Sequence, residues 1–201
     1  MNVIVVAHPD RLKWVELLQR HINVVAVVVD TVSARSGHLT ALRLASQHNE
    51  RVVIMEDDAI PVEGFDERSD WWADARPGDL LSFYLGTSRP KQFQALVDKR
   101  MAVADEKGDI ALCLPQLIHG VCYSIPQQNV AEVVYRMERL NRVREADFAI
   151  GAAWGREVCY PLESLVQHRD ETPVERHPDG QPRTEARVAR RLAAPLMFNP
   201  T

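Results

Sequence analysis

Three short runs of apolar residues, each followed by polar ones, limit the folds open to this chain. They are Val3 to Ala7, Val24 to Val29 and Val52 to Met55. Continuous runs of β-branched residues are typical of strands covered on both faces, as in parallel sheets. Between the first two runs, apolar residues recur at helical spacing from Leu12 to Ile22. This order predicts an α/β fold with a mostly parallel central sheet flanked by helices.

The third run ends in three consecutive acids, Glu56, Asp57 and Asp58. Because side chains alternate along a strand, Glu56 and Asp58 are expected to point the same way. Like charges this close repel each other unless a cation lies between them, and oxygen ligands suit Mg²⁺ or Mn²⁺. Open α/β sheets bind their ligands at the carboxyl edge. The triplet therefore predicts a divalent-metal site at that edge.

The same acids also fit ordinary turn chemistry. Acids after a strand often cap a helix or lie in a solvated turn, and Pro61 with Gly64 predicts a turn just beyond them. A string of three acids is a weak motif. Both interpretations stay open on these residues alone.

Length and composition favour one domain in a reducing compartment. A chain of 201 residues, 46% of them hydrophobic, is long enough for one well-buried core. The net charge of -4 gives no general attraction for nucleic acid or an anionic membrane. Three cysteines without metal-ligand spacing suit a reducing compartment. The sequence shows neither a basic leader nor an apolar stretch that could span a bilayer, so we expect a cytoplasmic location.

Candidate nucleotide contacts follow the first two apolar runs. The chain has neither the G-x-G-x-x-G motif of dinucleotide-binding proteins nor the P-loop motif. Arg11 and Asp30 nevertheless lie at the ends of the first two predicted strands, where a cation could bind phosphate and a carboxylate could bind ribose. An ordinary surface charge is the commoner explanation for either residue.

Two later positions are also candidates. Gly120 precedes a strand predicted over Val121 to Ile125, and a glycine there lets the backbone approach a ligand closely. Glu145 and Asp147 begin a predicted helical turn, where acids commonly stabilise a helix N-terminus. If Asp147 instead faces a cleft, it is a candidate general base.

Five segments follow one another in a recognisable order: His38 to Thr40, Val53 to Asp58, Gly120 to Ser124, Glu145 to Asp147, and Pro161 to His168. This series resembles the glycosyltransferase family of bacterial lipooligosaccharide and collagen galactosyltransferases. It is still more similar to the short glycosyltransferase-like proteins of actinobacterial phages. The resemblance covers most of residues 1–170. The chain departs from the family in carrying Glu as the first of the three acids, and in being shorter than most relatives.

The resemblance implies a single-domain, Rossmann-like GT-A fold over residues 1–170, followed by a polar and basic tail over residues 171–201. It implies that Glu56, Asp58 and His168 hold Mn²⁺ or Mg²⁺, and that Asp147 is the catalytic base. The implied donor-binding residues are Arg11, Asp30, Asp57 and Gly120.

The implied reaction moves a sugar from a nucleotide-sugar, expected to be a UDP-sugar, to a hydroxyl acceptor, with inversion favoured at the anomeric carbon. The acceptor stays open between a virion protein, a modified base in phage DNA and a surface glycan; a phage enzyme would act in the host cytoplasm. The basic residues from Arg183 to Arg191 keep DNA open, although the net negative charge argues against it. The alternatives are a non-catalytic nucleotide-sugar binding protein and a metal-dependent nucleotidyltransferase.

Overall fold

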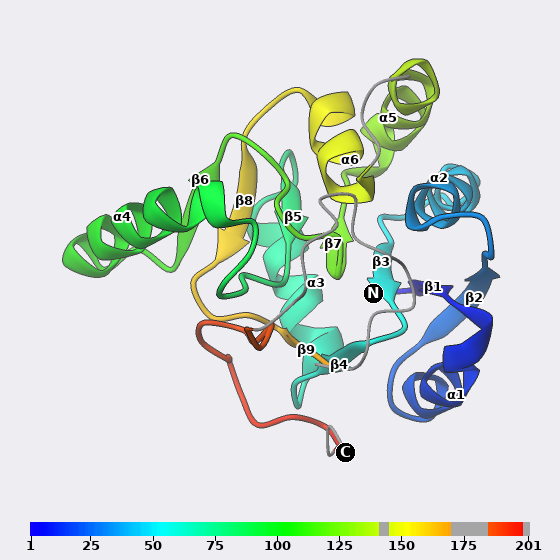
Figure 1. The fold of residues 1–201 in the computed structure, drawn as a ribbon, viewed down its shortest axis with the longest axis horizontal. Helices are drawn as coiled ribbons and strands as arrows, with labels where there is room; N and C mark the ends of the chain where they lie inside the picture. Colours follow the sequence, from blue (N-terminus) through cyan, green and yellow to red (C-terminus); the bar gives the residue numbers. More distant parts are fainter. Residues whose placement is uncertain (141–144, 170–184, 199–201) are drawn as a thin grey trace.

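The protein is built around one large sheet (Figure 1). The computed structural model describes residues 1–140, 145–169 and 185–198. Within these ranges the sheet has seven strands in the order β2-β1-β3-β7-β5-β8-β6. They are β1 (Val3–Ala7), β2 (Val24–Val29), β3 (Val53–Glu56), β5 (Leu80–Ser82), β6 (Ala111–Leu114), β7 (Cys122–Ser124) and β8 (Val158–Pro161). Of these described strands, β6 and β7 run against the other five. The predicted α/β fold with a mostly parallel sheet is confirmed.

Strand β1 is apolar at every position because both faces of the sheet are covered there. Along β1, Ile4 and Val6 belong to one core, whereas Val3 and Val5 belong to the other. All five residues of β1 are buried. Such a strand cannot expose a polar side chain without losing buried area on one of its faces. Polar residues can therefore enter only where the strand ends, as the third apolar run suggested.

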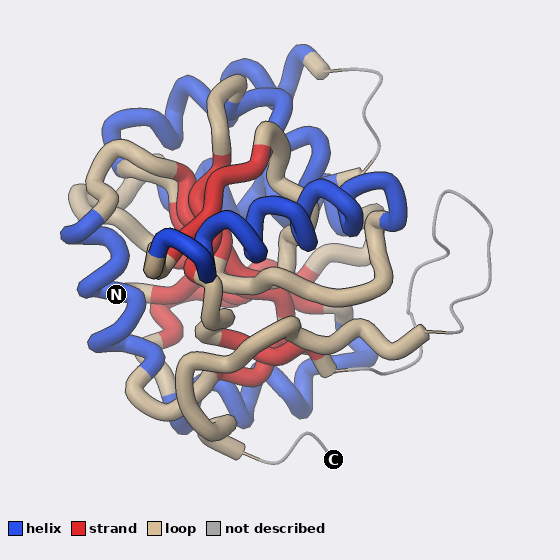
Figure 2. The backbone as a smooth tube through the Cα atoms, turned by 90° about the vertical axis from the view of Figure 1, so that its left-hand side faces the viewer, coloured by secondary structure: helices blue, strands red, loops and turns tan. Residues whose placement is uncertain are grey.

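Helices form a layer on each side of the sheet. One face is covered by α2 (Ala34–Ala45), α4 (Lys91–Lys107), α5 (Gln127–Arg139) and α6 (Ala146–Trp154). The other face is covered by α1 (Leu12–His21), α3 (Phe65–Ala75) and the C-terminal segment, residues 185–198. Figure 2 shows the strands inside and the helices around them. None of the helices that the structure describes combines the length and the apolar character needed to cross a bilayer.

A second, two-stranded sheet in the described part joins β4 (Ala59–Pro61) to β9 (Val166–His168). The strands are antiparallel, and Ala59 pairs with His168. Asp57 and Asp58 form the turn between β3 and β4, and a second turn lies at Glu63 and Gly64. A turn does follow the acids, as predicted, but Pro61 itself lies in β4. This small sheet brings a late histidine to the end of β3.

The first two helices begin in different ways. Helix α1 begins without a side-chain cap, directly after a 3-10 turn, Pro9–Arg11. Helix α2 begins after Ser33, whose side chain accepts a hydrogen bond from the Ser36 N–H. Ser33 has the extended backbone that an N-cap needs.

The C-terminal segment lies along the domain. Its Ala189, Leu192 and Leu196 form isolated β-bridges with Gly86, Ser164 and Val62 respectively. Arg190 and Arg191 form ion pairs with Asp98 and Asp105 of α4. Arg183, the first arginine of the predicted basic tail, lies outside the described residues.

Candidate metal and donor site

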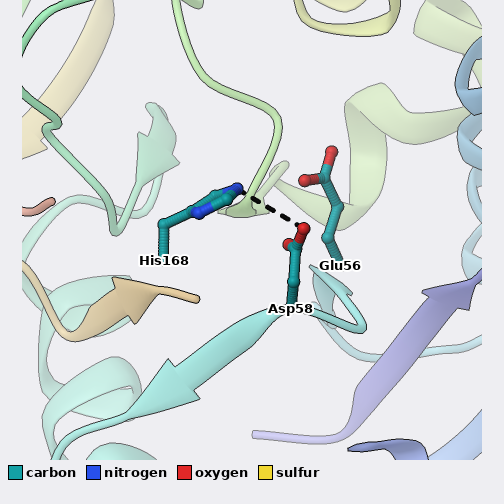
Figure 3. Close-up of side chains that lie close together, drawn as sticks. All are labelled: Glu56, Asp58 and His168. Carbon is teal, nitrogen blue, oxygen red and sulfur yellow. Dashed lines mark ion pairs between the residues drawn. The ribbon is translucent and has the colours of Figure 1, made fainter. Parts of the chain in front are cut away.

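Glu56, Asp58 and His168 meet where β3 ends and the β4–β9 sheet begins (Figure 3). Each offers one ligand atom, and these atoms all lie within 4.8 Å of one another. Strand β3 positions Glu56, and the turn after it positions Asp58. The pairing of Ala59 with His168 places the imidazole beside them. The structure thus brings together the three residues that were predicted to hold a metal, and their role as ligands stays a prediction.

Several buried atoms of this cluster lack hydrogen-bond partners within the part of the chain that the structure describes. They are Oδ1 of Asp58 and both ring nitrogens of His168. Nε2 of His168 lies 3.4 Å from Oδ2 of Asp58, and the two residues are only 3% and 5% exposed. Buried polar atoms are nearly always paired. A cation bound between the two side chains would satisfy Oδ1 of Asp58 and one ring nitrogen of His168, so the residues fit a metal.

Asp57 is held by the protein itself. Its Oδ2 accepts a hydrogen bond from the His8 N–H at 2.7 Å, and its Oδ1 lies 3.3 Å from Nη1 of Arg11. The same Nη1 lies 2.5 Å from Oδ2 of Asp58. Arg11 therefore bridges the two carboxylates and ties the end of β1 to the end of β3. The predicted donor contacts of Arg11 and Asp57 stay predictions.

The charges around Asp58 fix its protonation. Burial alone would raise the pKa of Asp58, but attraction to His168, Arg11 and Arg187 outweighs burial, and the pKa lies below its usual range. Burial lowers the pKa of His168, although Asp58 opposes this effect. An ionised carboxylate and a neutral imidazole are the forms that bind metal ions. Asp58 and His168 therefore have the protonation states of a cation site at neutral pH.

The neighbouring Asp57 has the opposite tendency. Burial and the negative charge of Asp58 raise the pKa of Asp57 to about 7, against the effect of the His8 N–H and of Arg11. Two adjacent carboxylates thus have pKa values shifted in opposite directions. Asp58 is the one that keeps its negative charge, as a metal ligand must.

His38 and Tyr123 support Glu56 from behind. Nε2 of His38 lies 3.1 Å from Oε1 of Glu56, and Nδ1 lies 3.1 Å from the Tyr123 hydroxyl. His38 is fully buried on α2, and Tyr123 is fully buried on β7. Since the imidazole is held on both sides, it fixes the orientation of the Glu56 carboxylate.

Gly120 makes room for this carboxylate. A Cβ atom on residue 120 would lie 3.2 Å from Oε1 of Glu56 and 3.6 Å from the His38 ring. The chain beyond it pairs with β3, and the Glu56 N–H donates to the carbonyl of Val121 at 2.8 Å. Gly120 therefore lies beside the predicted metal ligands. Its predicted role in donor binding stays a prediction.

Asp147 lies in the first turn of α6, on the same face of the sheet as His38. Burial raises the pKa of Asp147 to about 6, the hydrogen bond from the Phe148 N–H opposes the rise, and the negative charge of Glu56 adds to it. Helix α6 contacts α2, the helix that carries His38. A carboxyl group with this pKa can exchange a proton near neutral pH.

Asp30 makes hydrogen bonds that stabilise the fold. Its Oδ1 accepts hydrogen bonds from the Val32 and Ser33 N–H groups at 2.6 and 3.2 Å, which fixes the turn between β2 and α2. Burial would raise its pKa, but these bonds and that of Ser36 lower it. Asp30 is not a member of the carboxylate and histidine cluster described above. Its predicted contact with ribose is not tested.

Sequence reasoning missed the supporting role of His38 and Tyr123. His38 lies in the middle of α2, and a histidine inside a helix is usually a packed or solvated residue. The signal that could have revealed the pair is its polarity at inward-facing positions of α2 and β7, because a buried polar group needs a partner.

Comparisons with known proteins add little to this geometry. No family model matches the chain, and no curated protein matches its sequence. Among solved structures, the chain is similar to galactosyltransferase LgtC, determined in complex with donor and acceptor sugar analogues. The two are 12% identical, the match covers 80% of this chain and 73% of that chain, and the TM-score is 0.46. A likeness of this degree gives no information about activity.

Proposed function

We propose that this protein is a metal-dependent glycosyltransferase, which moves a sugar from a nucleotide-sugar to a hydroxyl group of an acceptor. The observation that carries the proposal is the cluster of Glu56, Asp58 and His168 at the carboxyl edge of the sheet. Open α/β sheets bind nucleotides at this edge. The order of sequence segments that resembles the galactosyltransferase family supports the same class of reaction.

The ligand set favours Mn²⁺ over Mg²⁺. Two carboxylates suit either ion, but the imidazole of His168 is a nitrogen ligand, which the harder Mg²⁺ accepts less readily. When bound, the ion would neutralise charge on the diphosphate leaving group. In our proposal Asp58 and His168 bind the ion directly. Glu56 is the third ligand, and its hydrogen bond with His38 orients its carboxylate.

Asp147 is the proposed general base. It would take the proton from the acceptor hydroxyl as that oxygen attacks the anomeric carbon. Its pKa of about 6 leaves it largely ionised at pH 7 while keeping it basic enough to accept a proton. In the proposed reaction, Arg11 also places a positive charge beside the metal ligands, where the donor phosphates would lie.

Inversion at the anomeric carbon, UDP as the nucleotide and a phage macromolecule as acceptor all remain parts of the proposal. Among acceptors, DNA receives the least support from the described contacts. Arg190 and Arg191 face acids of α4, so their charges are already matched. Binding to DNA through phosphate contacts would need cations that are available to the backbone.

The test is thermal unfolding with a panel of nucleotide-sugars, with and without Mn²⁺, on the wild type, Asp58→Asn and Asp74→Asn. Asp74 is an exposed acid on α3 and serves as the matched control. We expect one donor to raise the unfolding temperature of the wild type and of Asp74→Asn when Mn²⁺ is present. The same donor should not raise the unfolding temperature of Asp58→Asn. Donor hydrolysis or transfer would separate an enzyme from a binding protein. Release of pyrophosphate from a nucleoside triphosphate would instead identify a nucleotidyltransferase.

A further inference from the structure

Cys113 and Cys159 face each other across the last two strands of the sheet. They are register partners in the antiparallel pairing of β6 with β8. Leu112 and Leu114 point into one core, whereas Cys159 belongs to the opposite core and Cys113 packs against it. Both thiols therefore lie on one face of the sheet. Directly opposed residues in such a pair have Cα atoms about 4.5–5.5 Å apart, which is within the range that a disulfide spans.

The two thiols differ in access and in acidity. Strand β6 is at the edge of the sheet, and Cys113 is partly exposed there, whereas Cys159 is 1% exposed. A hydrogen bond from Cys159 lowers the pKa of Cys113 to about 7, and the same contact raises the pKa of Cys159. Because the thiolate is the reactive form of cysteine, Cys113 is suited to react first with a small molecule. Cys159 is then placed to react with Cys113.

We propose that Cys113 and Cys159 form a reversible dithiol–disulfide site whose oxidant is a small-molecule disulfide such as oxidised glutathione. The Cys113 thiolate attacks one sulfur of glutathione disulfide, which breaks that S–S bond, forms a mixed disulfide and releases one glutathione thiolate. Cys159 then loses its proton to that thiolate and attacks the sulfur of Cys113, which releases the second glutathione. Two protein thiols are oxidised, and one glutathione disulfide is reduced to two thiols.

This disulfide would close a loop that contains two of the proposed site residues. The chain between the two cysteines contains β7, α5 and α6, and with them Gly120 and Asp147. Closing this loop restricts the unfolded chain, so the oxidised protein is expected to be more resistant to thermal unfolding. The inference does not depend on the reaction that the protein catalyses.

Cys122 provides an internal control. It is fully buried on β7, and β5 and β8 separate it from β6 in the sheet order. Burial raises its pKa, so it is expected to stay a thiol under the same conditions. The wild-type protein therefore contains one reactive pair and one inert cysteine.

The experiment equilibrates the folded wild-type chain with oxidised glutathione, blocks free thiols under denaturing conditions and maps the peptides by mass spectrometry. We expect a linked Cys113–Cys159 peptide, a blocked Cys122, and reversal by a dithiol reductant. Cys113 and Cys122 share a tryptic peptide, so fragmentation must assign the linked residue. The unfolding temperature is expected to rise on oxidation.

Two variants identify the order of attack. In Cys159→Ser, Cys113 should accumulate as the glutathione mixed disulfide, and in Cys113→Ser, Cys159 should remain unmodified. A wild-type protein that keeps all three thiols free, or that retains glutathione on Cys113 without forming the internal bond, would overturn the proposal. The Cys113–Cys159 disulfide is mapped on the wild-type protein. The test therefore still decides the proposal if one of the variants fails to fold.

Discussion

Nε2 of His38 lies 3.1 Å from Oε1 of Glu56, although the two residues come from a helix and a strand on different parts of the chain. The hydroxyl of Tyr123 holds the other ring nitrogen. Carboxylates that bind metal ions are commonly oriented by such hydrogen bonds from behind. The contact therefore connects the interior of the sheet to the proposed metal site.

Replacing His38 by Leu should weaken Mn²⁺ binding by about 10- to 100-fold, because Glu56 would lose the bond that orients it. His38→Gln is the matched control, since its amide N–H can reach the position of Nε2 and should preserve most of the affinity. The affinities can be measured by calorimetric titration with Mn²⁺. If the Leu variant binds as tightly as the wild type, His38 has no role in orienting Glu56.

Replacing Arg11 by Ala should destabilise the fold by about 3–5 kcal/mol, because Asp57 and Asp58 would remain buried side by side without their shared cation. The side chain of Arg11 is only 8% exposed. Arg43 makes a 2.8 Å ion pair with Glu138 but is 54% exposed, so Arg43→Ala should cost less than about 1 kcal/mol. Urea unfolding of both variants measures the difference.

Added metal gives a second comparison for the Arg11 variant. A divalent cation beside Asp58 would supply part of the missing positive charge, so saturating Mn²⁺ should recover some stability in Arg11→Ala. The same Mn²⁺ should leave the difference between Arg43→Ala and the wild type unchanged. Equal losses in the two arginine variants would contradict a structural role for the Arg11 bridge.

Strands β1 and β3 could be predicted because their burial on both faces leaves a continuous apolar run. Strand β2 is also continuously apolar and was predicted, although it is an edge strand that exposes Val25 and Val29. Strand β1 occupies the predicted residues, and Glu56 and Asp58 do share a cluster, although Asp58 lies in the turn after β3 and not in the strand itself. His168 was a different case, since only the resemblance singled it out. Its position depends on the pairing of β4 with β9, which joins residues far apart in the chain and leaves no local pattern.

The parts that could not be predicted depend on long-range contacts or on weak local signals. Strand β6 is short, follows a surface helix and alternates between buried and half-buried residues, so its four residues gave no clear run. Arg11 was expected at the end of the first strand, which is correct, but its position did not reveal that it bridges Asp57 and Asp58. A sequence locates such groups on an element, while their partners come from the tertiary fold.

Gly120→Ala should weaken Mn²⁺ binding by about tenfold, because its Cβ would lie 3.2 Å from Oε1 of Glu56 and push a ligand out of place. The structural cost should stay within about 1–3 kcal/mol, as for other small overpacking changes. Gly78→Ala is the control, since nothing lies within 4 Å of a Cβ there. Unchanged metal affinity in Gly120→Ala would show that Glu56 can move aside without loss.

Asp147 should give the activity a pH dependence with a midpoint near 6. Burial raises its pKa to about 6, and only the ionised form can accept a proton from the acceptor. The rate at low substrate should therefore rise about tenfold per pH unit below this value and level off above it. A profile of kcat/KM against pH measures the midpoint, and an activity that is independent of pH between 4 and 7 would exclude Asp147 as the base.

Asp147 should also make the free energy of unfolding depend on pH, with the charged carboxylate lowering stability. A carboxylate that only stabilises a helix N-terminus would have the opposite effect. Because the folded pKa is about 6 and the ordinary value is 3.8, the folded protein holds a proton that the unfolded chain releases between these pH values. The contribution of Asp147 to stability should fall as pH rises from about 4 to 6 and then level off, with a total change of up to about 3 kcal/mol. Because Asp57 also titrates with a raised pKa, this contribution is measured as the difference between the wild type and Asp147→Asn. Asp147→Asn removes this one titrating group, so the stability of the wild type relative to the variant should fall over this pH range, and the variant should be the more stable protein above pH 6. The variant should also lose glycosyl transfer while retaining donor binding. Urea unfolding of both proteins at pH 4 and pH 8 measures the effect, and a less stable Asn variant at pH 8 would show that the carboxylate serves the fold rather than the reaction.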